Sequence, residues 1–444
     1  MSVLQRPGLR AVWLLVTLTS LLAGDAIRFT VGWTVFGIIA VGAGLCGVLI
    51  LIADRRRWRV GGLPYPLLVF VTLATVSLAW SAYPAATALG LLTTWLITVA
   101  AVAIAVTVNL PTLLRALGVV IGVVIAASLV FELVVATVVR APVLPLFTQP
   151  GVDYSQYEKI PKMLYWSRNE LFDVLGDGRI QGVVGNANNL GFIALLGVIV
   201  FSLLWADRLL ARRWAIVGLA LSLVCIFLTR SATVTVALLG VIVVVGALLA
   251  LRRAATPRAR LLTGGAIIAL AALGATAALL LRERFFELLG RSSDLTGRLG
   301  IWDAVIALAQ QRPVVGWGWV SYWVPWAAPF DNLAFRNGVR QLQAHNAWID
   351  VWFQLGVIGL LVFAALVAST LLRSWALATD RPQLTPAHPG TYRASTLLPV
   401  LVLTALLVQS MAESRLLVEF GWAFLVMFAV MTKRSEARSE DLFR

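Results

Sequence analysis

The stretch that interrupts this otherwise apolar chain contains Gly297-Arg298-Leu299-Gly300-Ile301-Trp302, then Gly316-Trp317-Gly318-Trp319, and then Ala344-His345-Asn346. These segments lie within residues 282–359, which hold one of the chain's two His residues. Seven of its 17 Trp residues also lie there: Trp302, Trp317, Trp319, Trp323, Trp326, Trp348 and Trp352. Polar and ionisable groups are costly in a membrane protein and mark functional sites. We therefore expect the chemistry of this protein in residues 282–359.

The sequence around this stretch predicts an all-α, polytopic integral membrane protein. Of 444 residues, 60% are hydrophobic and 13% are charged, and the mean hydropathy is +0.89. Apolar runs of about 20 residues recur, which is the length a helix needs to cross a bilayer. We count about 12 spans in a single transmembrane domain, 1–444. Two long loops interrupt it, at 140–189 and, between the ninth and tenth spans, at 282–345.

The distribution of arginine predicts the orientation of the chain. Basic residues cluster in alternate links and in the tail, at 54–59, 208–213, 252–260, 373–393 and 433–444. Short basic links face the cytoplasm, so we expect both termini there and both long loops outside. These links account for most of the net charge of +15, and we therefore expect membrane lipids, not nucleic acid, as partners.

Within the large loop, the spacing predicts one amphipathic helix. Ile301, Val305 and Leu308 recur at helical spacing, Arg298 lies in the first turn, and Pro313 lies beyond the end. Such a helix is expected on the membrane surface. The Trp and Tyr residues beyond it fit either a headgroup-level belt or platforms for sugar stacking. In the first long loop, the Asn residues of 185–191 fit either caps of the next helix or ligands of sugar hydroxyls.

The residues on the outer side favour one kind of chemistry. No nucleotide-binding or metal-binding motif is found, so we expect neither cofactor nor metal. Arginine binds pyrophosphate and keeps its charge, and a His near neutrality is a usual general base. The candidates are His345 with Arg230, Arg298 and Arg340. Arg230 also fits an interfacial snorkelling residue, Arg298 a packing or lipid contact, and His345 a structural residue at a helix start.

A transporter or flippase and a structural scaffold are the two other classes of function. Coupled transporters usually carry internal repeats and acidic residues within their spans, and neither feature is found here. A scaffold would not need the arginines and the histidine together.

Several of these motifs, taken in order, resemble the O-antigen ligase/polymerase superfamily of bacterial membrane glycosyltransferases. The resemblance covers roughly residues 80–359 and rests on order and spacing. The motifs are Trp80-Ser81-Ala82-Tyr83-Pro84, the Asn-rich turn 185–191, Arg230-Ser231, Gly297-Arg298 with Ile301-Trp302, Gly316-Trp317-Gly318, and His345-Asn346 followed by Gly356 and Gly359.

The resemblance implies metal-independent, inverting transfer of a glycan from a polyprenyl (undecaprenyl or decaprenyl) pyrophosphate to an acceptor hydroxyl. The reaction would take place on the outer face of the bacterial cytoplasmic membrane. It implies His345 as the base and Arg230 and Arg298 as ligands of the pyrophosphate, and Arg340 is added because it lies close to His345. Candidates for contacts with the glycan or the acceptor are Asn189, Trp302, Trp317 and Asn346.

The resemblance leaves the acceptor open, but it favours a ligase, because the family's ligases share the placement of His345-Asn346. A lipid, protein or cell-wall glycan acceptor would make the protein a ligase, whereas another lipid-linked repeat would make it a polymerase. One departure from the family concerns the base: many members carry an acidic residue where this chain has Gln354. If that acid orients the histidine, Asp350 or Glu413 has to take its place.

Overall fold

The computed structural model describes residues 6–441 except 174–175, 177, 281–297, 337, 381–382, 386–387 and 390–391. The first part of the predicted large loop, from Arg282 to Gly297, therefore lies outside the described residues. The helices are α1 (Pro7–Leu22), α2 (Gly24–Ala53), α3 (Tyr65–Val76), α4 (Pro84–Thr107), α5 (Leu110–Val134), α6 (Ala187–Ala206), α7 (Arg212–Thr229), α8 (Ala232–Arg253), α9 (Pro257–Leu280), α11 (Arg298–Ala309), α12 (Ala347–Thr379), α13 (Leu398–Ser410) and α14 (Glu419–Asp441).

The expectation of an all-α membrane protein is confirmed in its main feature. In the described residues, seven helices are long and apolar enough to cross a membrane: α2, α4, α5 with its π-helical extension, α6, α7, α8 and α12. Shorter apolar helices accompany them, and the count of about 12 spans stays a prediction. Strands of the described part form two short antiparallel hairpins, β1 (Phe335–Arg336) with β2 (Val339–Arg340) and β3 (Gln383–Thr385) with β4 (His388–Pro389).

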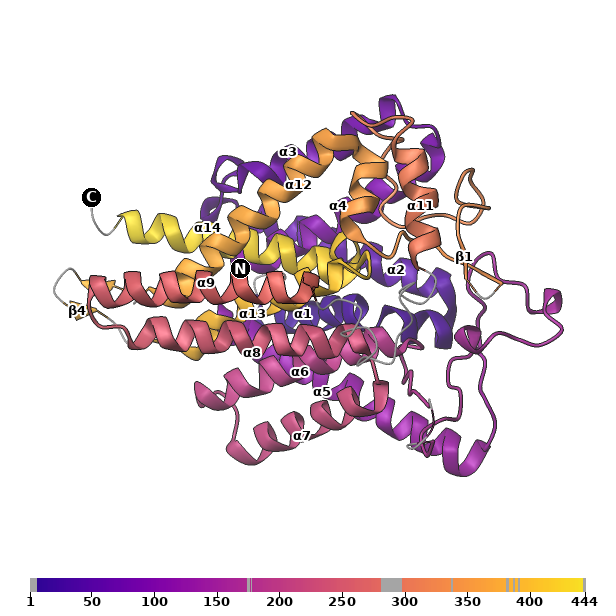
Figure 1. Ribbon diagram of the computed structural model, residues 1–444, viewed down its shortest axis with the longest axis horizontal. Coiled ribbons are helices and arrows are strands. Elements are labelled where there is room, and N and C mark those ends of the chain that lie inside the picture. Colours follow the sequence, from indigo (N-terminus) through magenta and orange to yellow (C-terminus); the bar gives the residue numbers. More distant parts are fainter. Residues whose placement is uncertain are drawn as a thin grey trace.

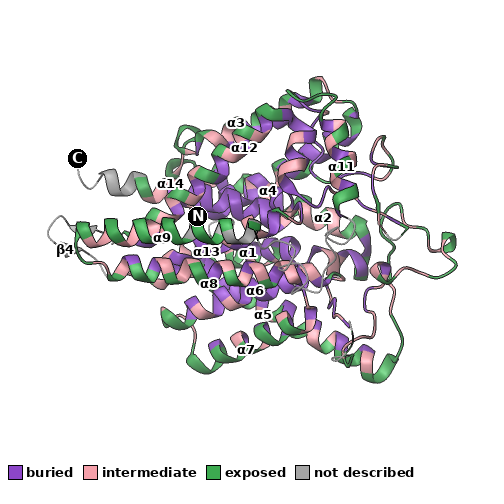
Figure 2. Cartoon of the chain, in the orientation of Figure 1, coloured by how far each residue is buried: buried purple, intermediate pink, exposed green. Residues whose placement is uncertain are grey.

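The core of the bundle lies around α6, α13 and α14, where most side chains are buried (Figure 2). Helices α7, α8 and α9 carry exposed apolar faces; Val243 and Ile268, for example, are 69% and 71% exposed. Because lipid tails are as apolar as these side chains, such faces are stable in a bilayer. Helices α6, α13 and α14 thus pack mainly on protein, whereas α7, α8 and α9 expose surfaces that fit lipid.

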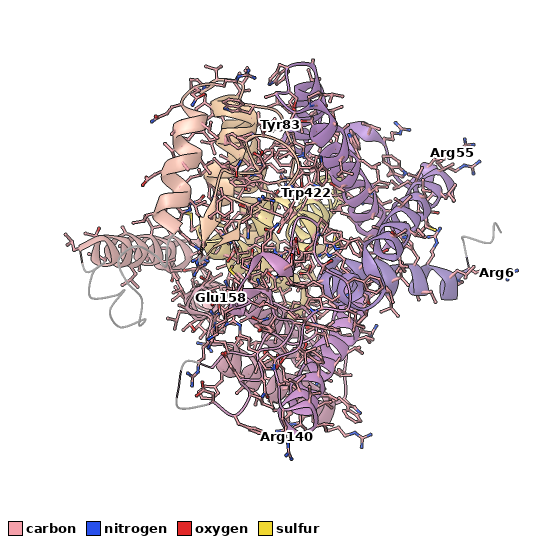
Figure 3. The ribbon with its side chains drawn as sticks, turned by 90° about the vertical axis from the view of Figure 1, so that its right-hand side faces the viewer. Arg6, Arg55, Tyr83, Arg140, Glu158 and Trp422 are labelled. Atoms are coloured by element: carbon pink, nitrogen blue, oxygen red, sulfur yellow. The ribbon has the colours of Figure 1, made fainter. Side chains whose placement is uncertain are left out.

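The arginine-rich links gather at one end of the bundle. Arg10 pairs with Asp54 at 2.8 Å, Arg252 Nε donates to Ala378 O at 2.6 Å, and Arg434 Nη1 donates to Arg57 O at 3.1 Å. In Figure 1, β4 and the C-terminus lie at this end, whereas α11 and β1 lie at the opposite, loop-bearing end. The loop-bearing end faces the viewer in Figure 3, where Glu158 of the first long loop lies between Tyr83 above and Arg140 below. This partition of charge is the pattern on which the predicted orientation depends.

A backbone kink in α12 anchors the large loop to the bundle. Gly356 has φ +66°, and a Cβ there would lie 2.1 Å from Val314 O. At this break, Val357 N donates to Pro313 O at 2.8 Å and Gly318 N to Gln354 O at 2.9 Å. Only glycine accepts both this backbone conformation and so close an approach. The kink thus replaces hydrogen bonds within α12 by bonds to the segment that follows α11.

The large loop has a small hydrophobic core of its own, and this corrects the expected surface helix. Helix α11 does form, with described residues Arg298–Ala309, and in Figure 1 it runs across the ends of the long helices. Its apolar side chains, however, pack against loop residues and the start of α12. The cluster includes Tyr83, Ile301, Val305, Trp323, Phe330 and Phe353. The apolar face of α11 therefore contacts protein, not lipid.

The aromatic residues beyond α11 divide between the core of the bundle, which includes Trp319, the core of the loop, which includes Trp323, and the surface. Trp319 and Trp323 are 0% and 1% exposed, and their indole N–H groups donate to Thr94 Oγ1 at 2.9 Å and Asp350 Oδ1 at 3.0 Å. Trp326 is 60% exposed. The expectation of a headgroup belt is thus wrong for Trp319 and Trp323, because burial with a satisfied N–H makes them core residues.

Candidate active site

The carboxylate of Glu413 is the centre of a buried polar cluster at the loop-bearing end. Glu413 lies in the tight turn that follows α13. Its Oε1 accepts hydrogen bonds from Arg298 Nη2 at 2.9 Å and Asn188 Nδ2 at 3.0 Å. Its Oε2 accepts one from Gln343 Nε2 at 2.9 Å and lies 3.0 Å from His345 Nδ1. The starts of α6, α11 and α12 therefore meet on one carboxylate from the end of α13.

The backbone around His345 fixes the position of its ring. His345 has φ +52°, a left-handed conformation that is uncommon outside glycine. The next residue, Asn346, is the N-cap of α12: its Oδ1 accepts from Trp348 N at 3.0 Å and Ile349 N at 3.3 Å. Both residues are buried, and His345 is 7% exposed. His345 therefore precedes the N-cap of α12, and its left-handed backbone and its burial limit the positions that the ring can take.

Electrostatics keep Glu413 ionised. Burial alone raises the pKa of Glu413, but the charge and hydrogen bond of His345, followed by the charges of Arg298 and Arg415, lower it to about 2. An opposite charge within a few ångströms favours the charged form of a carboxyl group. The site thus holds a permanent anion that pairs with an arginine on one oxygen and a histidine on the other.

The acidic partner of His345 is Glu413, and neither Asp350 nor the amide at position 354 takes its place. Gln354 is buried, and its Oε1 accepts from Val320 N at 2.8 Å and Ser321 N at 3.0 Å. Asp350 accepts from Gln354 Nε2 at 2.8 Å. Both side chains therefore hold the large loop against α12, and the acid that contacts the histidine comes from the turn after α13.

The three predicted arginines occupy different surroundings. Arg298 is part of the cluster and is 7% exposed, and its Nε is buried with no hydrogen-bond partner among the described residues. Arg340 Nη1 lies 3.5 Å from Pro325 O. Arg230, which has a left-handed conformation between α7 and α8, donates from Nη1 to Gly176 O in the first long loop. The structure thus places Arg298 beside the pair of Glu413 and His345, whereas Arg230 and Arg340 contact backbone carbonyls of the two long loops.

The four residues expected to contact glycan or acceptor have mainly structural contacts in this state. Trp317 Nε1 donates to Leu308 O at 2.8 Å. Asn189 is buried at the start of α6, and Asn346 Nδ2 donates to Met411 O at 3.4 Å. Trp302 is half-buried, and its Nε1 has no hydrogen-bond partner in the described part of the chain. Of the four, Trp302 alone offers a buried, unused donor.

Asn186 and Asn188 divide the two roles considered for the Asn-rich turn. Asn186 is the N-cap of α6, with its side chain accepting from Asn188 N and Asn189 N. The Asn188 side chain, by contrast, joins the cluster: Oδ1 accepts from Ser231 Oγ at 2.9 Å and from Arg179 Nη2 at 3.0 Å. The capping interpretation is therefore confirmed for Asn186, whereas Asn188 connects the turn after α7 to Glu413.

The sequence did not single out Gln341 and Gln343, and it indicated Asn188 only as a helix cap or a ligand of sugar hydroxyls. Gln341 Oε1 lies 3.0 Å from His345 Nε2, and Gln343 and Asn188 both donate to Glu413. Positions 341, 343 and 345 alternate, and alternate residues of an extended segment share one face. The alternation with His345 is thus the feature of the sequence that indicates that both glutamines lie on the side of the histidine. No local pattern distinguishes Asn188 from its neighbours.

The cluster can transfer a proton and bind an anion. A histidine oriented through Nδ1 by a carboxylate presents Nε2 to a substrate, which is the arrangement of a general base. An adjacent arginine binds anionic oxygens through several donors. Within the described part of the chain, no three His, Cys, Asp or Glu side chains gather as candidate metal ligands. The guanidinium of Arg298 supplies a positive charge that pairs with Glu413.

Comparisons with known proteins agree with the resemblance given by the motifs. Residues 217–364 match the Wzy_C family, described as O-antigen ligase. This stretch contains Arg230, Arg298 and His345, whereas Asn188 and Glu413 lie outside it. The chain is also similar to the exopolysaccharide production protein ExoQ of Rhizobium meliloti (strain 1021), with 29% identity over 201 residues, 42% of this chain and 45% of that protein.

The match thus covers less than half the length of that relative. Both comparisons nevertheless support the O-antigen ligase/polymerase superfamily, and the stretch matched by the family model includes the candidate histidine and all three candidate arginines. The resemblance of this chain to the O-antigen ligase/polymerase superfamily is therefore confirmed.

Proposed function

We propose that this protein is a membrane glycosyltransferase that moves a glycan from a polyprenyl pyrophosphate carrier to an acceptor hydroxyl. The reaction would take place on the outer face of the bacterial cytoplasmic membrane, invert the anomeric carbon and need no metal. The observation that carries the proposal is the buried ion pair of Arg298 with Glu413 at 2.9 Å, whose other oxygen contacts His345 at 3.0 Å.

His345 is the general base of the proposed reaction. Its Nε2 removes the proton of the acceptor hydroxyl as the oxygen attacks the anomeric carbon, and the anion of Glu413 stabilises the imidazolium that forms. Glu413 thus has the orienting role that the family resemblance assigned to an acidic residue at the position of Gln354. The supporting contact is the 3.0 Å approach of Glu413 Oε2 to Nδ1.

Arg298 is the first ligand proposed for the leaving pyrophosphate. Guanidinium groups bind phosphate oxygens through paired hydrogen bonds, and a pyrophosphate leaves with little need for protonation. The unused buried Nε of Arg298 supports this role. Arg230 and Arg340 remain candidate ligands for the distal phosphate or for the glycan, and Arg340 Nε, like that of Arg298, is buried without a hydrogen-bond partner in the described part of the chain.

The acceptor distinguishes two versions of the same chemistry. A ligase would transfer the glycan to a lipid, protein or cell-wall acceptor, and a polymerase would transfer it to a second lipid-linked repeat. The polymerase is the second candidate, and it is compatible with the similarity to an exopolysaccharide production protein of Rhizobium meliloti. A lipid-linked oligosaccharide flippase is the alternative from another class.

The decisive experiment follows release of polyprenyl pyrophosphate by mass spectrometry. The protein is reconstituted in nanodiscs with a polyprenyl-pyrophosphate oligosaccharide, an acceptor pool and EDTA. We expect release by wild type and by Arg55→Gln, an exposed arginine at the opposite end, but not by His345→Ala. The co-product identifies the acceptor. Equal binding or translocation by all three proteins without release would replace the transferase with the flippase.

A further inference from the structure

The second ring nitrogen of His345 has a partner of its own. Nε2 lies 3.0 Å from Gln341 Oε1. Gln341 is 7% exposed, and its backbone N–H donates to Ala334 O at 2.9 Å. Its side-chain NH₂ donates to Val339 O at 2.9 Å. Because that carbonyl can only accept, the amide group of Gln341 turns its oxygen toward the histidine.

This orientation has a consequence for the charge of the ring. A carboxylate oxygen and a carboxamide oxygen are both acceptors, and His345 has one of each at its two nitrogens. Only the imidazolium form donates from both nitrogens. In the neutral form with Nδ1 protonated toward Glu413, the lone pair of Nε2 would face the oxygen of Gln341. The arrangement is therefore complementary to the protonated histidine.

We propose that Gln341 is a positioning residue that stabilises protonated His345 and occupies the place of the acceptor hydroxyl until the acceptor arrives. This inference rests on the proposed transferase function. The acceptor oxygen forms its bond to the anomeric carbon while the bond from that carbon to the pyrophosphate oxygen breaks. When the acceptor displaces Gln341, the imidazolium first gives its Nε2 proton to water. The hydroxyl proton then moves to the freed Nε2, and the bonding pair leaves with the pyrophosphate. Gln341 then returns to Nε2 and accepts its hydrogen bond.

The charged side chains near His345 in the described part of the chain have other partners. Glu413 occupies Nδ1 and is paired with Arg298. Asp350, on α12, accepts from Trp323 Nε1 at 3.0 Å and from Ala344 N at 3.3 Å. Arg415 pairs with Glu419 on the far side of the turn. Nε2 therefore depends on Gln341 for its hydrogen bond in this state.

The protonation of His345 can be measured without any substrate, because the chain has two histidines. In a His388→Asn background, ¹⁵N-histidine labelling leaves the ring nitrogens of His345 as the only imidazole signals in the NMR spectrum. The titration midpoint is then compared between the parent protein, Gln341→Ala and Gln341→Glu. Gln310→Ala is the matched control, since Gln310 is exposed on the surface after α11.

We expect Gln341→Ala to move the midpoint to lower pH by about one unit, because a hydrogen bond to the charged form is lost. Gln341→Glu should move it to higher pH by about as much, because a second anion faces the ring. Gln310→Ala should leave it unchanged. Equal midpoints in all four proteins would overturn the role of Gln341. Gln341→Glu preserves the shape of the side chain, and its elution as one symmetrical peak verifies folding.

The assay of polyprenyl pyrophosphate release separates this inference from the function on which it rests. The pH of half-maximal release should shift with each variant as the NMR midpoint does, and Gln341→Ala should lower the KM for the acceptor while it lowers kcat. A shifted NMR midpoint without release by the parent protein would refute the transferase and leave the contact standing. Release by the parent protein with an identical pH profile in Gln341→Ala would refute the role of Gln341 alone.

Discussion

Glu413 Oε2 lies 3.0 Å from His345 Nδ1, although 68 residues separate the two positions in sequence. The contact joins the turn after α13 to the residue that precedes the N-cap of α12. It converts a lone histidine into a histidine with a fixed orientation and a permanent anion beside it. The functional proposals therefore depend most on this pair, and its two members are the first residues to test.

Glu413→Gln should reduce glycan transfer by roughly 10²-fold or more, because the neutral amide neither holds the Nδ1 proton as firmly nor stabilises the imidazolium. The measurement is the initial rate of polyprenyl pyrophosphate release. Asp303→Asn, at an exposed acidic position on α11, is the matched control and should retain the parent rate. A Glu413→Gln protein as active as the parent would show that the carboxylate has no part in base activation.

The pH dependence of stability should also reflect the ionisation of Glu413. Its pKa is lowered from the ordinary 4.5 to about 2, so the ionised form stabilises the folded state above about pH 4.5. This contribution declines as the pH falls from about 4.5 to about 2 and Glu413 takes up a proton. We expect the unfolding temperature of the parent protein to fall more steeply over this window than that of Glu413→Gln. Parallel curves for the two proteins would contradict the lowered pKa.

Arg298→Gln should both weaken donor binding and lower the rate, with a loss of about 10²-fold in kcat/KM, since a charged ligand of the leaving group disappears. Arg298→Lys should recover part of this loss, because it keeps the charge but not the paired donors. Steady-state kinetics with varied donor concentration test both variants, and Arg55→Gln is the control for loss of an exposed arginine. Unaltered donor KM and kcat in Arg298→Gln would remove Arg298 from the pyrophosphate site.

Gly356→Ala should destabilise the protein by about 2 kcal/mol or more, because a Cβ would meet Val314 O at 2.1 Å in a left-handed backbone conformation. Gly246 on α8 has no atom within 4 Å of the corresponding Cβ position, so Gly246→Ala is the matched control and should keep or raise stability. Thermal unfolding in detergent compares the two variants. Equal unfolding temperatures would mean that the kink of α12 tolerates a side chain.

The orientation of the bundle can be tested by labelling single cysteines. In a background with Cys46→Ala and Cys225→Ala, we expect Asn332→Cys in the large loop to react with an impermeant maleimide on intact spheroplasts. Gly61→Cys at the basic end should react only after permeabilisation. Both positions are exposed, so accessibility alone does not explain a difference. The reverse pattern would place the candidate site on the cytoplasmic side.

The sequence alone determined the helical membrane architecture and the separation of basic links from long loops. Length and apolarity decide whether a segment is stable as a helix in a bilayer, and both are local properties. The same holds for helix α11 and for the capping role that was one of two interpretations of the Asn-rich turn. His345 was also singled out from the sequence, because it is one of two histidines and lies at the head of a long apolar run.

Tertiary structure alone decided which groups surround that histidine. Glu413 and Gln341 contact it through turn and loop conformations, and Asn188 donates to Glu413. Trp323 became core because the loop folds on itself, and Trp319 because it packs into the core of the bundle. The cost of burying a charge depends on the partners that reach it in space, and sequence separation does not limit those partners. For that reason the sequence predicted the helices and the base, whereas the packing of helix ends determined the acid beside it.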